Sequence, residues 1–270
     1  MKIIFTLILF LAFLESSFAE ITPYLQSGTH ESMIINWELE SSVSAELSYG
    51  TTKSLGTKVT ATDEAIGDNH IWYTVQLNGL IPNTVYYYQI KTDTEESDIF
   101  KFKTFASPGE EEGHIRFIVR SDNQTNYLVA TSIVNAMHEK LIELFGDDFD
   151  NSIDFVFDAG DIVGTGSDLS AYQREYFEPL APLSPYIPSM VSIGNHENES
   201  PYFYQYMKYD DFAGGEGEAY YSFQIGRILV VAVNSNWQWR NDTQIEWLAD
   251  VLDDAEKNNE IDWIFTFCHH

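Results

Sequence analysis

The sequence predicts an all-β sandwich followed by an α/β domain, and three observations support this prediction. Short alternating runs of apolar and polar residues, divided by turn residues, fill the stretch from about Ile21 to Phe105. From His114 onward, strand-like apolar runs alternate with helix-like segments. Four of these later runs end in Asp, Asn or His, residues that bind metal ions. A chain of 270 residues is long enough for two such domains.

The first residues have the features of a secretory signal peptide. Lys2 supplies a positive charge, and the apolar run from Ile3 to Leu14 is too short to span a bilayer comfortably. Ser17 and Ala19 place small residues around a cleavage site after Ala19. We therefore predict a signal peptide at residues 1–19 and a secreted or periplasmic protein; the alternative is an uncleaved anchor. No later segment has the length and apolarity of a membrane helix.

The composition excludes several classes of partner. The chain has 14 Lys and Arg against 42 Asp and Glu, a formal net charge of -28. Such a chain repels nucleic-acid phosphates and anionic lipids but attracts divalent cations. We expect no nucleic-acid partner, and no membrane partner after signal cleavage. Cys268 is the single cysteine, so an intrachain disulfide and a Cys-rich metal site are both excluded.

The N-terminal part, residues 20–105, has the pattern of a small β-sandwich. Trp37 suits the buried Trp of an early strand, and the spacing of Leu80, Pro82, Thr84 and Tyr86 suits a tyrosine corner. The expected strands are 33–39, 45–50, 72–77, 80–90 and 99–105. This part resembles a fibronectin type III domain, in particular the one that precedes the catalytic domain of purple acid phosphatases. We expect it to position the domain that follows a linker at 106–113.

The second part, residues 114–270, alternates strands with helices. The segment 128–145 has apolar residues at helical spacing, and the segment 169–178 is a polar helix that ends at a group of prolines. A further helix starts at Asp242, with Asp or Asn as its cap. The expected strands are 114–119, 152–158, 190–193, 227–233 and 263–267.

Four polar side chains follow these strands directly. They are Asp122, Asp161, Asn195 and His269. Because ligand sites of α/β sheets lie at the carboxyl ends of the strands, we expect these side chains to converge. Oxygen and imidazole donors suit Mn, Fe, Zn or Mg. Gly160 and Gly194 allow the tight turns that such a convergence needs.

The second part resembles the calcineurin-like metallophosphoesterases in the order of its motifs, which are strand–Asp122, Gly160-Asp161, Gly194-Asn195-His196-Glu197 and strand–His269. With the sandwich in front, the chain is similar to the purple acid phosphatase-like branch of that family. The resemblance implies a mixed-sheet β-sandwich flanked by helices and two divalent or trivalent ions (Fe, Zn, Mn or Mg). It implies that Asp122 binds the first ion, Asp161 bridges both, and Asn195 and His269 bind the second. His196 is then a candidate general acid near the leaving group, with Glu197 orienting it.

Three departures from the family pattern stand out. The Gly-His-x-His loop that supplies one ligand to each metal is not found before His270, so we expect either a fragment, truncated within its second domain, or a degenerate protein. Gly164 stands where the purple branch has a tyrosine ligand, so an Fe(III)–tyrosinate is not expected. Gln124 replaces the His of the superfamily's Asp-x-His motif. Its carbonyl could bind metal, or its amide could bond to substrate or to a ligand carboxylate.

The leading functional prediction is a secreted hydrolase of small phosphate monoesters, acting by metal-hydroxide attack at a two-metal site. The alternative is an inactive secreted homologue or fragment that acts as a binding module. Bound metal together with hydrolysis of an aryl phosphate distinguishes the two.

Overall fold

The computed structural model describes residues 22–67, 70–111, 113–209, 212–215 and 217–270. The predicted signal peptide at 1–19 lies outside these residues. Within the described part of the chain, none of the helices has the length and apolarity needed to cross a membrane.

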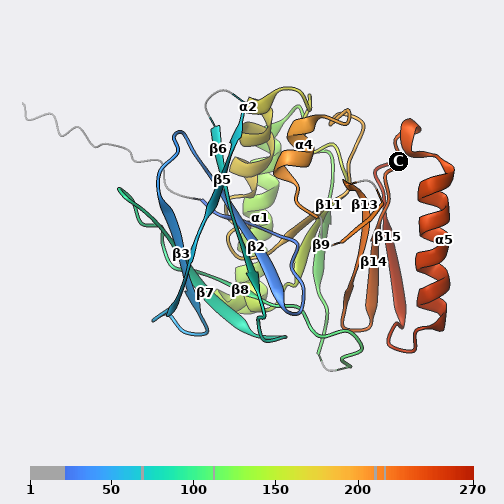
Figure 1. The fold of residues 1–270 in the computed structure, drawn as a ribbon, viewed down its shortest axis with the longest axis horizontal. Coiled ribbons are helices and arrows are strands. Elements are labelled where there is room, and N and C mark those ends of the chain that lie inside the picture. The colour runs from blue at the N-terminus through green and yellow to red at the C-terminus, as the bar shows by residue number, and fades with distance from the viewer. Residues whose placement is uncertain (1–21, 68–69, 112, 210–211, 216) are drawn as a thin grey trace, which may run out of the picture.

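The N-terminal part forms two facing sheets, one on each side of an apolar core. One sheet has the order β4-β3-β7-β8, and the other begins β5-β6-β2-β1 (Figure 1). Trp37 is buried in this core and stacks on Tyr73 with 5.4 Å between the ring centroids. The Tyr86 hydroxyl accepts a hydrogen bond from the Ile81 N–H, which confirms the predicted corner. The strands are β1 (Tyr24–Gln26), β2 (Ser32–Leu39), β3 (Ala45–Gly50), β4 (Thr57–Thr60), β5 (Thr62–Ile66), β6 (His70–Asn78), β7 (Val85–Thr92) and β8 (Phe100–Lys103).

The second part contains parallel strands, a second sheet and helices. Its strands are β9 (Phe117–Arg120), β10 (Phe155–Asp158), β11 (Ser189–Val191), β12 (Ala213–Gly215), β13 (Gly217–Ile225), β14 (Ile228–Ala232) and β15 (Trp263–Phe267). Its helices are α1 (Tyr127–Phe145), η1 (Gly146–Asn151), α2 (Leu169–Ala171), η2 (Tyr172–Phe177), α3 (Glu178–Leu180), α4 (Pro201–Tyr206), η3 (Trp237–Trp239) and α5 (Asp242–Lys257). The architecture is the predicted mixed-sheet α/β fold.

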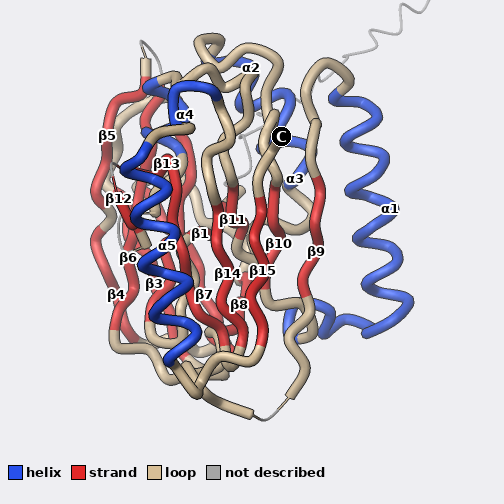
Figure 2. The backbone as a smooth tube through the Cα atoms, turned by 90° about the vertical axis from the view of Figure 1, so that its right-hand side faces the viewer, coloured by secondary structure: helices blue, strands red, loops and turns tan. Residues whose placement is uncertain are grey.

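The layers of this part are visible in Figure 2. The sheet β12-β13-β14-β15 packs against β9, β10 and β11, where Phe157 stacks on Phe267 at 3.9 Å between ring centroids. Helix α5 covers the outer face of β14 and β15, and α1 lies on the opposite side of the molecule (Figure 2). Strand β15 is the edge of its sheet and exposes Trp263, Ile264 and Phe265.

A single seven-stranded sheet runs through both parts of the chain. Its order is β5-β6-β2-β1-β11-β10-β9, and β1 pairs antiparallel with β2 but parallel with β11. The junction is the pairing of Gln26 with Ser189. We predicted two successive domains and did not predict the shared sheet. Pairing between strands about 160 residues apart leaves no signal in the local sequence pattern.

Most of the predicted elements of the second part are present. The Asn241 side chain caps α5 by accepting a hydrogen bond from the Gln244 N–H at 3.0 Å, as expected for an Asn at this position. The polar segment from residue 169 is helical as predicted, but it is divided into α2, the wider turn η2 and α3. Pro179 lies in the first turn of α3, which continues directly from η2.

A buried amide network stabilises the junction of the two parts. Gln26 is fully buried, and its Oε1 accepts hydrogen bonds from Asn36 Nδ2 at 2.8 Å and from the Lys208 N–H at 3.3 Å. Its Nε2 donates to the Tyr24 hydroxyl at 3.2 Å and to Met207 Sδ at 3.2 Å. The network therefore joins β1 and β2 to the segment that follows α4.

We expect Gln26→Leu to lower the free energy of unfolding by about 2–3 kcal/mol, because the buried Asn36 amide and the Lys208 N–H lose their acceptor. Urea unfolding followed by tryptophan fluorescence measures this change. The control is Glu40→Leu at an exposed site, which we expect to change stability by less than about 0.5 kcal/mol. Equal effects of the two substitutions would contradict the stabilising role of the network.

Candidate metal centre

The four predicted ligands all lie just beyond the carboxyl ends of strands. Asp122 follows β9, Asp161 follows β10, Asn195 follows β11 and His269 follows β15. Strands β9, β10 and β11 are neighbours in one parallel array, and β15 belongs to the sheet that packs against it. Figure 2 shows the C-terminal end of the chain beside the upper ends of these strands.

Three of these side chains converge. Asp122, Asp161 and His269 each offer one donor atom, and these atoms lie within 4.8 Å of one another. His269 Nε2 is 3.2 Å from Asp161 Oδ2, and His269 Nδ1 bonds to the Ala159 carbonyl at 2.8 Å. The carbonyl fixes the imidazole so that Nε2 faces the carboxylate, an arrangement typical of metal-binding histidines. Two carboxylates and one imidazole fit a divalent transition metal or Mg²⁺.

Asp161 is the centre of this cluster. It is 3% exposed, and its Oδ1 accepts a hydrogen bond from the His196 N–H at 3.0 Å. Its Oδ2 accepts one from Gln124 Nε2 at 3.0 Å. Gln124 therefore bonds to a ligand carboxylate, one of the roles considered for it, while its Oε1 is buried without a hydrogen-bond partner among the described residues.

Two glycines make room for Asp161, as the sequence predicts. A Cβ on Gly194 would lie 2.2 Å from Asp161 N and 2.3 Å from Asp161 Oδ1. Gly160 has a φ of +84°, and a Cβ there would lie 2.8 Å from Gly194. The turns after β10 and β11 are thus in main-chain contact, and no larger residue fits between them.

The backbone around the site is strained. Asp122 and Asp161 have φ values of 58° and 52°, and Thr125, a β-branched residue, has a φ of 71°. Such conformations persist only where surrounding contacts enforce them, and they concentrate at functional sites. The two aspartates predicted as ligands are therefore held in fixed positions rather than placed on free loops.

Glu197 supplies much of this constraint. It is fully buried, and its two oxygens accept hydrogen bonds from the N–H groups of Asp161, Val163 and Gly194 at 3.0, 3.1 and 2.7 Å. Burial raises the pKa of Glu197 to about 7, while these backbone bonds oppose the shift. The prediction that Glu197 orients His196 stays a prediction; the hydrogen bonds of its carboxylate go to the backbone of the two loops.

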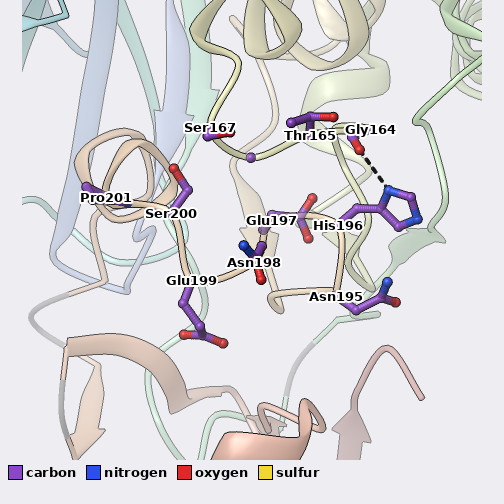
Figure 3. Close-up of a pocket in the computed structure, with 11 residues that line it drawn as sticks. Gly164, Thr165, Ser167, Asn195, His196, Glu197, Asn198, Glu199, Ser200 and Pro201 are labelled. Atoms are coloured by element: carbon purple, nitrogen blue, oxygen red, sulfur yellow. Dashed lines mark hydrogen bonds between the residues drawn. The ribbon is translucent and has the colours of Figure 1, made fainter.

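The His196 imidazole bonds to the Gly164 carbonyl. Its Nδ1 bonds to Gly164 O at 2.8 Å, which raises the pKa of the imidazole (Figure 3). Its Nε2 lies 3.8 Å from Asp161 Oδ2, and the side chain is 41% exposed. Asn195 is exposed and extends to the same side as His196 in Figure 3. Its role as a ligand stays a prediction.

The sequence analysis did not identify several buried residues that support the site. Arg120 and Asp158 form a buried ion pair with 2.5 Å between Arg120 Nε and Asp158 Oδ1, and Tyr176 donates to Asp158 Oδ2 at 3.2 Å. Asn236 donates to the Gly194 carbonyl at 3.0 Å. Asn236 follows β14, so a search for polar residues after strands could have found it. The ion pair could be predicted only from the register of β9 against β10, in which Arg120 pairs with Asp158.

We expect Gly194→Ala to weaken Mn²⁺ binding by at least about tenfold, because the new Cβ must displace Asp161. Isothermal titration with MnCl₂ measures the affinity. Thr165→Ala, on the neighbouring segment, should bind Mn²⁺ like the unmodified chain. An unchanged affinity in Gly194→Ala would show that Asp161 is not part of the metal site.

Comparison with known proteins gives two family matches. Residues 20–104 match the N-terminal domain of purple acid phosphatases, and residues 66–270 match the calcineurin-like phosphoesterases. No match was found among curated protein sequences.

Comparison with solved structures shows that the fold is similar to that of PhoD. PhoD has a TM-score of 0.61 at 18% identity, and the match covers 83% of this chain and 54% of PhoD. This chain therefore spans about half the length of PhoD. The sensor domain of the anti-sigma factor RsgI4 of Pseudobacteroides cellulosolvens matches at 19% identity with a TM-score of 0.28, over 33% of this chain and 95% of that domain. The strand-end ligands and the match over residues 66–270 lead to one conclusion: the chain belongs to the calcineurin-like phosphoesterase family.

Proposed function

We propose that this protein is a metal-dependent hydrolase of phosphate monoesters that works with two bound metal ions. The observation that carries the proposal is the convergence of Asp122 and His269 on the buried carboxylate of Asp161. Metal ions held there would neutralise phosphate charge and lower the pKa of a water molecule to make a nucleophile. The fold and family support the reaction class, and the purple acid phosphatase match at 20–104 favours monoesters.

The residues of the chain have distinct parts in this reaction. Asp122, Asp161 and His269 bind metal, and Asn195 is the proposed further ligand. His196 faces the same centre, and its raised pKa suits a group that donates a proton to the leaving oxygen. Glu197 and Gln124 act through Asp161, which they hold by hydrogen bonds.

We also propose that the protein is exported. The support is the charge at Lys2, the apolar run Ile3–Leu14 and the small residues Ser17 and Ala19. Expression of the whole reading frame followed by N-terminal sequencing of the product tests this proposal. A mature chain beginning at Glu20 is the expected result, and an intact Met1 in every fraction would contradict it.

We expect Asp161→Ala and His196→Ala to separate metal binding from turnover. Asp161→Ala should lose bound metal and lower kcat/KM for p-nitrophenyl phosphate by at least about 1,000-fold, because the shared carboxylate is removed. His196→Ala should keep its metal and lose about 100- to 10,000-fold in kcat. Elemental analysis measures the metal.

The control for this pair is Asp168→Asn, an exposed carboxylate that is not among the three converging residues. We expect it to keep both metal and activity. Equal loss of metal in Asp161→Ala and His196→Ala would refute the role of His196. A chain that binds metal but hydrolyses no aryl phosphate would favour the binding-module alternative.

A further inference from the structure

A pocket lies beside the metal centre, between the segments 164–167 and 195–201 (Figure 3). Its volume is about 460 Å³, enough for a sugar-sized group. His196 and Asn195 line the pocket, and His196 Nε2 lies 3.8 Å from Asp161 Oδ2, so the pocket adjoins the centre at which a phosphate would bind. A group in this pocket therefore lies where the leaving group of a phosphate ester would extend.

The two walls of the pocket are joined at Gly166. The Gly166 N–H donates to the His196 carbonyl at 2.9 Å. A Cβ on Gly166 would lie 2.0 Å from the Glu197 carbonyl oxygen, so only glycine permits this approach. The spacing of the walls is thus set by main-chain contact rather than by mobile side chains.

Glu199 holds the wall formed by residues 195–201 in a strained conformation. Asn198 and Glu199 have φ values of 49° and 52°, two successive left-handed residues that are not glycine. Glu199 Oε1 accepts hydrogen bonds from the amides of Asn234, Asn236 and Gln238 at 3.2, 3.3 and 3.0 Å, and Oε2 accepts one from the Tyr204 hydroxyl. These four bonds fix the turn that presents Asn198 at the pocket, so the pocket is pre-organised.

Three side chains in the pocket lining are uncharged hydrogen-bonding groups without a partner among the described residues. Thr165, Ser167 and Asn198 are exposed, and the described residues give their side chains no hydrogen-bond partner. Hydroxyl and amide groups can both donate and accept, which is the pairing that a hydroxyl-bearing ligand needs.

Lys and Arg are absent from the described lining of this pocket, where His196 is the one basic side chain. Glu197 and Glu199 contribute carboxylates to the same lining. Arg174, on η2, is paired with Glu175 at 2.6 Å and with Asp168 at 3.9 Å. A second anionic group in this pocket would therefore lie close to the Glu197 and Glu199 carboxylates, with no Lys or Arg among the described lining residues to balance it.

We propose that this pocket is the leaving-group subsite and that it selects an uncharged, hydroxyl-bearing group, such as the sugar or polyol part of a phosphate monoester, over one that carries a second anion. Thr165, Ser167 and Asn198 bind the hydroxyls, and Glu199 is a positioning residue that holds Asn198. The proposal rests on the proposed function, because it assigns the substrate class of that same site.

The test compares glucose 6-phosphate with 6-phosphogluconate, which have the same number of carbons but differ by one carboxylate. We expect kcat/KM of the full chain to be about tenfold higher for glucose 6-phosphate. Thr165→Lys should abolish or reverse this preference. Asn135→Lys, which adds the same charge on the exposed surface of α1, should keep both the preference and the activity toward p-nitrophenyl phosphate.

A binding measurement separates this proposal from the proposed function. Saturation-transfer NMR of the full chain with glucose or gluconate reports occupancy without phosphate or turnover; we expect a signal for glucose, little for gluconate, and the reverse in Thr165→Lys. Hydrolysis of p-nitrophenyl phosphate with equal kcat/KM for the two sugar phosphates would overturn the subsite. If no metal supports hydrolysis, the proposed function is wrong. A missing glucose signal in the NMR experiment would overturn the subsite.

Discussion

The site depends on the close contact between Asp161 and the turn that contains Gly194. Main-chain atoms of two loops meet there with no side chain between them, since a Cβ on Gly194 would lie 2.2 Å from Asp161 N. Contact this close leaves buried N–H groups in need of acceptors, and the Glu197 carboxylate supplies them for Asp161, Val163 and Gly194. The same contact places the His196 N–H on Asp161 Oδ1, so one carboxylate is fixed by its neighbours before any metal binds. Asp122 and His269 then converge on a carboxylate whose position is already fixed.

The remaining fold holds the strands that carry these loops in a fixed order. Strand β11, which precedes Gly194, is only three residues long, and it is flanked by β10 on one side and by β1 of the N-terminal part on the other. Gln26 supports this junction with four hydrogen bonds from one buried side chain. The N-terminal part therefore extends the sheet that carries the ligands, and it does more than precede the catalytic part along the chain.

Much of this arrangement could be predicted from sequence because it is local. The runs that became α1, α5 and β15 have clear periodicity, and Gly160-Asp161 and Gly194-Asn195-His196-Glu197 follow apolar strands, where ligands of α/β sheets lie. The rest depends on contacts between distant residues. The Arg120–Asp158 pair follows from the register of β9 against β10, and the role of Glu197 follows from the approach of two loops. The pairing of β1 with β11 depends on neither composition nor periodicity, so it cannot be predicted from either segment alone.

Charge connects the metal centre to the substrate. The chain carries a net charge of -28, and both Asp122 and Asp161 add carboxylates at the point where a phosphate must bind. Without cations this surface would repel a phosphate ester, so in the proposed reaction the metal ions would bind the substrate as well as activate water. Their positive charge is confined to the ligand cluster, while the adjoining pocket is lined by amides, hydroxyls and carboxylates. An ester with one phosphate and a neutral body matches this division in the proposed site, because its single charged group would lie at the metal centre and its hydroxyls at Thr165, Ser167 and Asn198.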